Sequence, residues 1–361
     1  EAQLFKETVS SVVSWSSRRW SVVSSVSWLS KHKCADYISR IRDDGVSQEE
    51  FTRRSSQLRQ SVVSDSAQLR QEALTHFADE TFRNSPVTWD TAVARWHEWY
   101  AESIGMDMTF KNADGDTAKK QGINRFTPEK QEERYAKLND LESNLREEWG
   151  DDLTTFLLGF TASNSPYGDL ISPIDHFEAL TSSRDAIRRE LYRQLDGRDF
   201  EYVWMVDAHE SGYLHYHLAV FVRGDVPKSI FEPVLRRHVD NCEFAEMEAH
   251  KPQETVTRRR EITNLSAYMM SYMTPDEISD PRTHPLEWQM LYAVLWLSNS
   301  RMWSSSQGAK RYMASGEYDS DDDWELDKIE YADGTEVKAD EMRVDREGAV
   351  TYLVEWEPPP F

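Results

Sequence analysis

The chain has 361 residues, of which 64 are acidic and 42 are basic, giving a formal net charge of −22 at pH 7. Such acidity argues against nucleic-acid binding at ordinary ionic strength. Near 1 M salt, however, the Debye length falls to about 3 Å, so distant surface carboxylates no longer repel phosphate. Acidic surfaces are common among halophiles, and we therefore expect a cytoplasmic protein of a halophilic host. No apolar run reaches the roughly 18 residues of a membrane span, which excludes a membrane partner. The two cysteines form no CxxC pair, which argues against a zinc knuckle.

Residues 1–150 are expected to form a mostly helical accessory region. The stretches at 89–105 and 127–149 are typical of helices, and the second has a capping threonine and many charged side chains. No recognisable binding motif occurs there, although the region is a candidate for contacting duplex DNA.

Residues 151–315 alternate apolar strands with amphipathic helices, which predicts an α+β domain. Glycine between the second and third strands indicates a hairpin. We therefore expect an antiparallel sheet with a central hairpin, covered by helices. The predicted strands are 154–162, 200–209 and 213–222, and the predicted helices are 182–195, 228–239 and 263–273.

Residues 316–361 turn strongly acidic and are expected to form an acidic C-terminal tail. A last alternation of apolar residues at 349–356 predicts one further strand.

The predicted hairpin contains two polar histidine side chains within an otherwise apolar strand. His215 and His217 are two residues apart, so they share one face of the strand. With a three-residue loop at 210–212, Asp207 lies directly opposite His215. Two imidazoles and a carboxylate then converge as a divalent-metal site with positions open for substrate. A two-residue loop would send Asp207 to the other face, and His209 is the alternative third ligand.

The predicted helix at 263–273 carries two tyrosines on one face. Tyr268 and Tyr272 are spaced i, i+4, so their hydroxyls lie one turn apart. Packing in the core is one reading of such a pair. The other is a nucleophile toward a phosphodiester, which needs a metal or a base because the phenol pKa is near 10.

Three stretches in this order resemble the HUH-superfamily endonucleases. They are "FLLGFTAS" (156–163), "DAHESGYLHYHLAVF" (207–221) and "YMMSY" (268–272). They are most similar to the two-tyrosine rolling-circle replication initiators, and with the acidic composition they suggest a haloarchaeal plasmid or virus version. The resemblance covers roughly residues 154–275.

The resemblance implies an enzyme that nicks and rejoins one DNA strand at an origin. Tyr268 or Tyr272 would become linked to a 5′ phosphate, with Mg²⁺ or Mn²⁺ held by His215, His217 and Asp207. Many relatives carry a lysine beside the tyrosines, which this chain lacks. Arginines would have to bind DNA instead, and the candidates are Arg258, Arg259, Arg260, Arg188 and Arg189.

The expected partners are single-stranded origin DNA, a host polymerase and a host helicase, since the sequence has no G-x-x-x-x-G-K-[ST] loop. Three other readings stay open. A relaxase or single-strand transposase shares the chemistry, a non-haem Fe(II) oxygenase shares the two-histidine, one-carboxylate donor set, and a non-catalytic DNA-binding or structural protein needs no metal.

Overall fold

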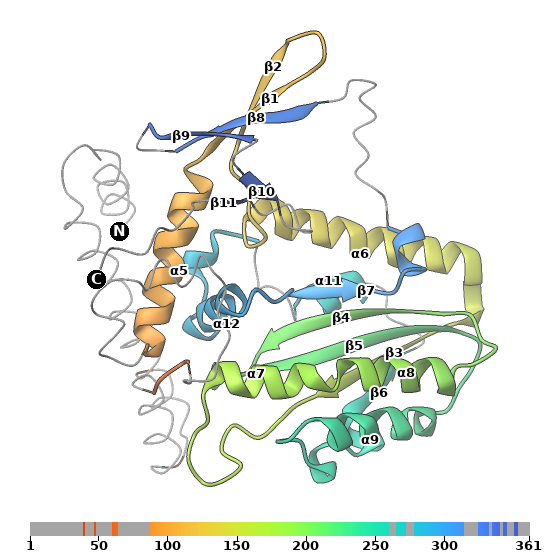
Figure 1. Ribbon diagram of the computed structural model, residues 1–361. Coiled ribbons are helices and arrows are strands. Elements are labelled where there is room, and N and C mark those ends of the chain that lie inside the picture. The colour runs from red at the N-terminus through yellow and green to blue at the C-terminus, as the bar shows by residue number, and fades with distance from the viewer. Residues whose placement is uncertain are drawn as a thin grey trace. The chain divides into compact units, whose positions relative to one another are not determined.

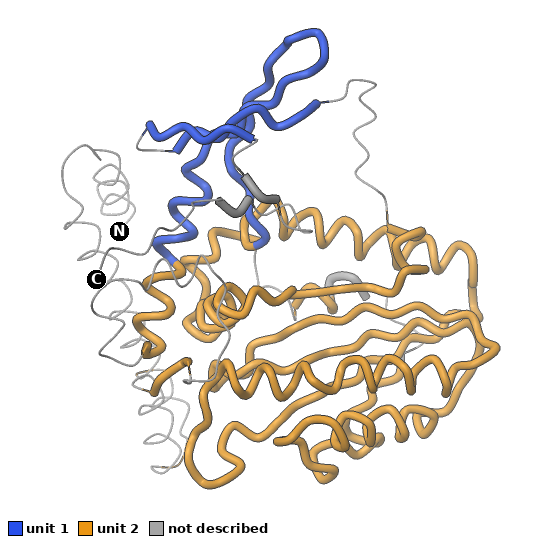
Figure 2. The backbone as a smooth tube through the Cα atoms, viewed as in Figure 1, with its two compact units in different colours: residues 1–29, 97–125, 318–361 blue, residues 30–96, 126–317 orange. Residues whose placement is uncertain are grey.

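The structure is a computed structural model that describes residues 39, 47, 60–63, 87–259, 265–271, 278–313, 324–331, 334–339, 342–344 and 350–352. The chain divides into two compact units (Figure 2). The described parts of unit 1 come from His97–Arg125 and Tyr318–Phe361, and those of unit 2 come from Ser30–Trp96 and Phe126–Glu317.

Unit 2 is built around a five-stranded antiparallel sheet with the strand order β6-β3-β5-β4-β7 (Figure 1). The strands β3 and β5 lie inside the sheet, and their long apolar runs are buried on both faces, so both faces of the sheet are covered. The strands are β3 Leu153–Phe160, β4 Phe200–Ala208, β5 Leu214–Arg223, β6 Val256–Arg259 and β7 Trp303–Ser305.

One face of this sheet packs against α7 Pro173–Ser182, α8 Arg184–Gln194 and α9 Glu232–Asn241. The ring of Phe177 on α7 lies 5.8 Å from that of Tyr216 on β5, and His238 on α9 lies 5.3 Å from Phe160 on β3. Because side chains alternate along a strand, the even-numbered residues of β3, β4 and β5 form this face.

The odd-numbered residues of the same strands form the other face, which is buried at Val203, Met205, Ala219 and Phe221. The helix α12 contacts β4, while α6 contacts β3 and α11. Every residue of α12 except Glu287 is buried, as expected for a helix inside a core. These helices are α6 Pro128–Trp149, α11 Leu265–Met270 and α12 Leu286–Leu297.

Short elements connect these layers. They are α10 Pro252–Thr255 and the 3₁₀ helices η1 Gly150–Asp152, η2 Lys228–Phe231, η3 Met247–Ala249, η4 Pro281–Thr283 and η5 Ala309–Arg311. The helix α5 Trp89–Ile104 begins in unit 2 and continues into unit 1.

Unit 1 contains a four-stranded antiparallel sheet with the order β2-β1-β8-β9. In it β8, from the C-terminal part of the chain, pairs with β1, more than 200 residues earlier. A separate pair joins β10 and β11. The strands are β1 Asp107–Lys111, β2 Thr117–Gln121, β8 Glu325–Glu330, β9 Glu336–Lys338, β10 Met342–Val344 and β11 Val350–Tyr352.

The predicted α+β class with an antiparallel sheet and helical cover is confirmed. The expected division at 150 and 315 stays a prediction, and α6 belongs to the same compact unit as the five-stranded sheet. The expected acidic C-terminal tail is not confirmed, and among the described residues of 316–361 the strands β8 and β9 belong to the four-stranded sheet of unit 1. In the described part of the chain, no helix combines the length and apolar character needed to cross a membrane.

Candidate metal centre

The hairpin of β4 and β5 has the predicted register. Asp207 pairs with His215, and Met205 pairs with His217. The three-residue turn closes because the His209 amide donates to the Tyr213 carbonyl over 2.9 Å, and Gly212 adopts a positive φ of 80°. A positive φ favours glycine at this position.

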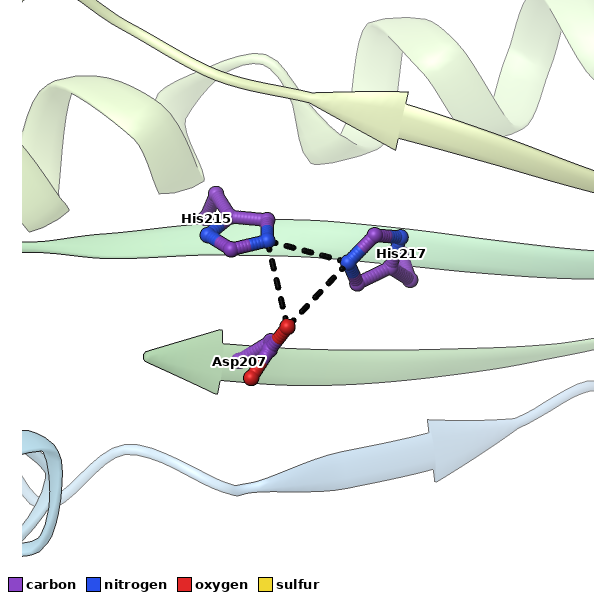
Figure 3. Close-up of side chains that lie close together, drawn as sticks. All are labelled: Asp207, His215 and His217. Carbon is purple, nitrogen blue, oxygen red and sulfur yellow. Dashed lines mark hydrogen bonds and ion pairs between the residues drawn. The ribbon is translucent and has the colours of Figure 1, made fainter. Parts of the chain in front are cut away.

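Asp207, His215 and His217 project together from the odd-numbered face of the sheet (Figure 3). The Asp207 Oδ2 atom lies 3.2 Å from His215 Nε2 and 3.4 Å from His217 Nε2. The two Nε2 atoms are 3.0 Å apart. Their side chains are 13 to 20% exposed, so the group is mostly buried but still in contact with solvent.

The electrostatics of this group favour a cation. Burial lowers the pKa of His217, although the Asp207 carboxylate opposes that shift, so His217 is neutral near pH 7. Burial alone would raise the pKa of Asp207, but hydrogen bonds from His215 and His217 outweigh it and the pKa is lowered. A partly buried carboxylate therefore faces two imidazole nitrogens at close range.

This donor set fits a divalent metal ion. Two imidazole nitrogens and one carboxylate oxygen are standard ligands for such ions, and all three atoms lie within 4.8 Å of one another. Among the described residues this is the one group of histidine, cysteine and acidic side chains with that spacing. His209 is outside the group, and its ring centre is 6.2 Å from that of His215.

The end of β3 beside this group is held by three buried histidines that were not predicted from the sequence. His238 Nε2 lies 2.9 Å from the Thr161 carbonyl oxygen, and the Thr161 amide donates to His250 Nε2 over 3.2 Å. His176 Nε2 lies 3.1 Å from the Ala162 carbonyl oxygen. We call these three side chains the histidine clamp. It fixes the corner that follows Gly159, whose partner across the sheet is His217.

Burial lowers the pKa of both His176 and His238 to about 4, and it also lowers the pKa of His250. The clamp is thus neutral near pH 7. A signal for His238 is present in the sequence, because it shares the apolar face of α9 with Val234 and Leu235, four and three residues earlier.

The predicted nucleophile Tyr268 lies on α11, and its side chain is half-buried. The carbonyl of Tyr268 accepts a hydrogen bond from Ser271 Oγ over 2.7 Å. Tyr272 lies outside the described residues.

The arginine candidates whose side chains the structure describes, Arg258, Arg188 and Arg189, lie on the other face of the sheet from the metal-binding group or on the helix that covers that face. Arg258 pairs with Phe156 on the even-numbered face, where its guanidinium lies 6.0 Å from that ring and forms an ion pair with Asp225. The backbone of Arg259 pairs with Thr155, and Arg260 lies outside the described residues. Arg188 and Arg189 are exposed on α8, where Arg188 is 3.1 Å from Asp185.

The sequence is similar to one protein family and to two proteins of halophilic organisms. Residues 60–351 match the family model described as "Putative rep protein (DUF1424)". An "Uncharacterized 36 kDa protein" of Halobacterium salinarum is 39% identical over 258 residues, covering 66% of this chain and 82% of the relative. A protein of the same description from Halobacterium sp. (strain GN101) is 34% identical over 262 residues, covering 65% and 79%. Both sources are halophiles, in agreement with the acidic composition. No solved structure matches the chain.

Proposed function

The chain belongs to the family described as "Putative rep protein", and we propose that it initiates replication by nicking and rejoining one strand of origin DNA. The observation that carries this proposal is the convergence of Asp207, His215 and His217 on one face of the central hairpin. For the nicking reaction, this group would act on a DNA phosphodiester, and a second group must attack its phosphorus as the nucleophile.

The nucleophile in this proposal is the hydroxyl of Tyr268 or Tyr272. The phenol oxygen attacks the phosphorus of a DNA phosphodiester, the bond from phosphorus to the 3′ oxygen breaks, and the phenol proton passes to that oxygen. The products are a 5′-phosphotyrosine and a free 3′-OH. Because the new ester conserves the bond energy, the reverse attack by a 3′-OH rejoins the strand without ATP.

His215, His217 and Asp207 would hold Mg²⁺ or Mn²⁺. Such an ion, when bound, supplies Lewis acidity that polarises the scissile phosphate. His217 contributes a neutral imidazole nitrogen, since burial lowers its pKa. The histidine clamp holds the end of β3, the strand whose Gly159 pairs with His217.

The proposed partners follow from the products. The free 3′-OH would prime a host polymerase, and a host helicase would separate the strands. Arg188 and Arg189 on the exposed side of α8 are candidates for contacts with DNA away from the metal-binding group. Relaxases and single-strand transposases use the same chemistry, and release of a closed unit-length circle would distinguish an initiator from them.

Cleavage of a labelled single-stranded DNA library in molar KCl with Mn²⁺ or Mg²⁺ tests the proposal. We expect protein covalently joined to the 5′ end of the fragment downstream of the cut, visible on a denaturing gel. The adduct should vanish in His215→Ala/His217→Ala and in Tyr268→Phe/Tyr272→Phe. The matched control is Tyr192→Phe, which alters a half-exposed tyrosine on α8 and should leave the adduct unchanged.

If the protein binds Mn²⁺ but forms no covalent adduct with DNA, the result would contradict the nicking activity. An adduct that persists without added metal and in the double histidine variant would contradict the role of the metal-binding group.

A further inference from the structure

The turn between β4 and β5 holds a histidine that the proposed reaction does not use. The backbone of His209 is fixed on both sides, because its amide donates to Tyr213 and its carbonyl accepts from the Gly212 amide over 2.7 Å. The side chain of His209 is exposed, whereas Ser211 beside it is 2% exposed.

The ring of His209 is oriented by Ser211. The Ser211 amide donates to His209 Nδ1 over 3.2 Å, and Ser211 Oγ lies 2.9 Å from the same atom. Because Nδ1 accepts from an N–H group, the neutral ring carries its proton on Nε2. The turn therefore presents one N–H donor of fixed tautomer at the exposed tip of the hairpin.

This donor borders the metal-binding group. The ring centre of His209 is 6.2 Å from that of His215, compared with 4.8 Å between His215 and His217. The sequence offers no lysine beside the tyrosines, and Arg258 lies on the opposite face with Asp225 as its partner. His209 is thus placed beside any phosphate held at the group.

We propose that His209 is a substrate-binding residue whose Nε2–H donates to a non-bridging oxygen of the DNA phosphate, and that it is not a metal ligand. This inference rests on the proposed function. The competing account is that His209 only caps the turn through Ser211.

Two substitutions separate these accounts. His209→Asn keeps a short side-chain acceptor for the Ser211 amide and removes the Nε2–H donor. His209→Gln places an amide donor close to the position of Nε2 and loses the acceptor at Nδ1. If His209 only caps the turn, His209→Asn should keep its function. If His209 contacts the phosphate, His209→Gln should keep DNA binding.

The test uses the full chain carrying Tyr268→Phe/Tyr272→Phe, which cannot cleave. Fluorescence anisotropy measures the affinity for a labelled single-stranded DNA library in molar KCl with Mn²⁺, and electron paramagnetic resonance measures Mn²⁺ affinity without DNA. We expect His209→Asn to weaken DNA binding about tenfold, as for a lost hydrogen bond to a charged group. His209→Gln should bind DNA nearly as the parent does, and Mn²⁺ affinity should be unchanged in both.

DNA binding by His209→Asn equal to that of the parent would overturn the proposal in favour of a turn cap. A fall in Mn²⁺ affinity in both variants would overturn it in favour of a metal ligand. If the parent binds Mn²⁺ but no DNA, the proposed function fails together with this inference. If the parent binds DNA and His209→Asn does too, the inference about His209 fails alone.

Discussion

The histidine clamp predicts a specific dependence of stability on pH. His238 is fully buried, and its pKa is lowered from 6.5 to about 4. Above pH 6.5 the ring is neutral in both the folded and the unfolded chain. Between pH 6.5 and 4 only the unfolded chain takes up the proton, so the free energy of unfolding falls as the pH falls through this window.

The size of the effect follows from the shift. A change from 6.5 to about 4 at roughly 1.4 kcal/mol per pH unit amounts to about 3 kcal/mol for His238. The variant His238→Gln cannot titrate. We therefore expect its free energy of unfolding to fall by about 3 kcal/mol less than that of the wild type between pH 7 and pH 4.

Chemical denaturation in molar KCl, followed by far-UV circular dichroism at several pH values, measures this difference. The matched control is Val234→Ala on the same helix, where a fully buried side chain is shortened without removing a titrating group. Its loss of stability should be the same at pH 7 and pH 4. Parallel pH profiles for the wild type and His238→Gln would refute the assignment of His238 as a buried neutral histidine.

Three further substitutions test the site and its support. Asp207→Asn removes a charged ligand and should weaken Mn²⁺ binding about tenfold or more in a calorimetric titration; unchanged affinity would remove Asp207 from the ligand set. Arg184→Met removes a guanidinium 5.4 Å from the Trp204 ring and 5.3 Å from the Tyr216 ring, and should cost roughly 1–2 kcal/mol of unfolding free energy; no loss would mean that these contacts are not stabilising. Gly212→Ala places a side chain at a φ of 80° and should cost about 1 kcal/mol or more, and a variant as stable as the wild type would contradict the described turn.

The central hairpin could be predicted because its determinants are local. Alternation with a period of two puts His215 and His217 on one face, and the glycine at 212 indicates a tight turn. The sequence left two loop lengths open, and the structure has the three-residue loop that pairs Asp207 with His215. The strand β3 and the helix α8 lie within two residues of their predicted bounds, since each carries its own apolar pattern. The helix predicted at 228–239 is divided into the 3₁₀ helix η2 and the α-helix α9.

Other parts of the fold depend on partners far away in the chain. The three residues of β7 have no strand pattern of their own, and they pair only because β4 offers its edge. The pairing of β1 with β8 joins segments more than 200 residues apart. The helix α12 is apolar on nearly all sides, so periodicity could not reveal it.

The histidine clamp escaped prediction for a different reason. His176 and His250 bond to backbone atoms rather than to side chains, so no spacing between residue types marks them. Only the fold brings them to Thr161 and Ala162. By contrast, the metal-binding group consists of side chains on paired strands, and strand geometry alone brings them together.

The most direct test of the central claim is to identify the amino acid that becomes linked to DNA. After cleavage of the single-stranded library with Mn²⁺, nuclease and trypsin digestion should release residues 261–282, whose tyrosines are Tyr268 and Tyr272. Mass spectrometry should find a nucleotide on one of these two residues, and none when His215 and His217 are both replaced by alanine. A nucleotide on any other peptide, or none in a protein that binds Mn²⁺ at this group, would contradict the account.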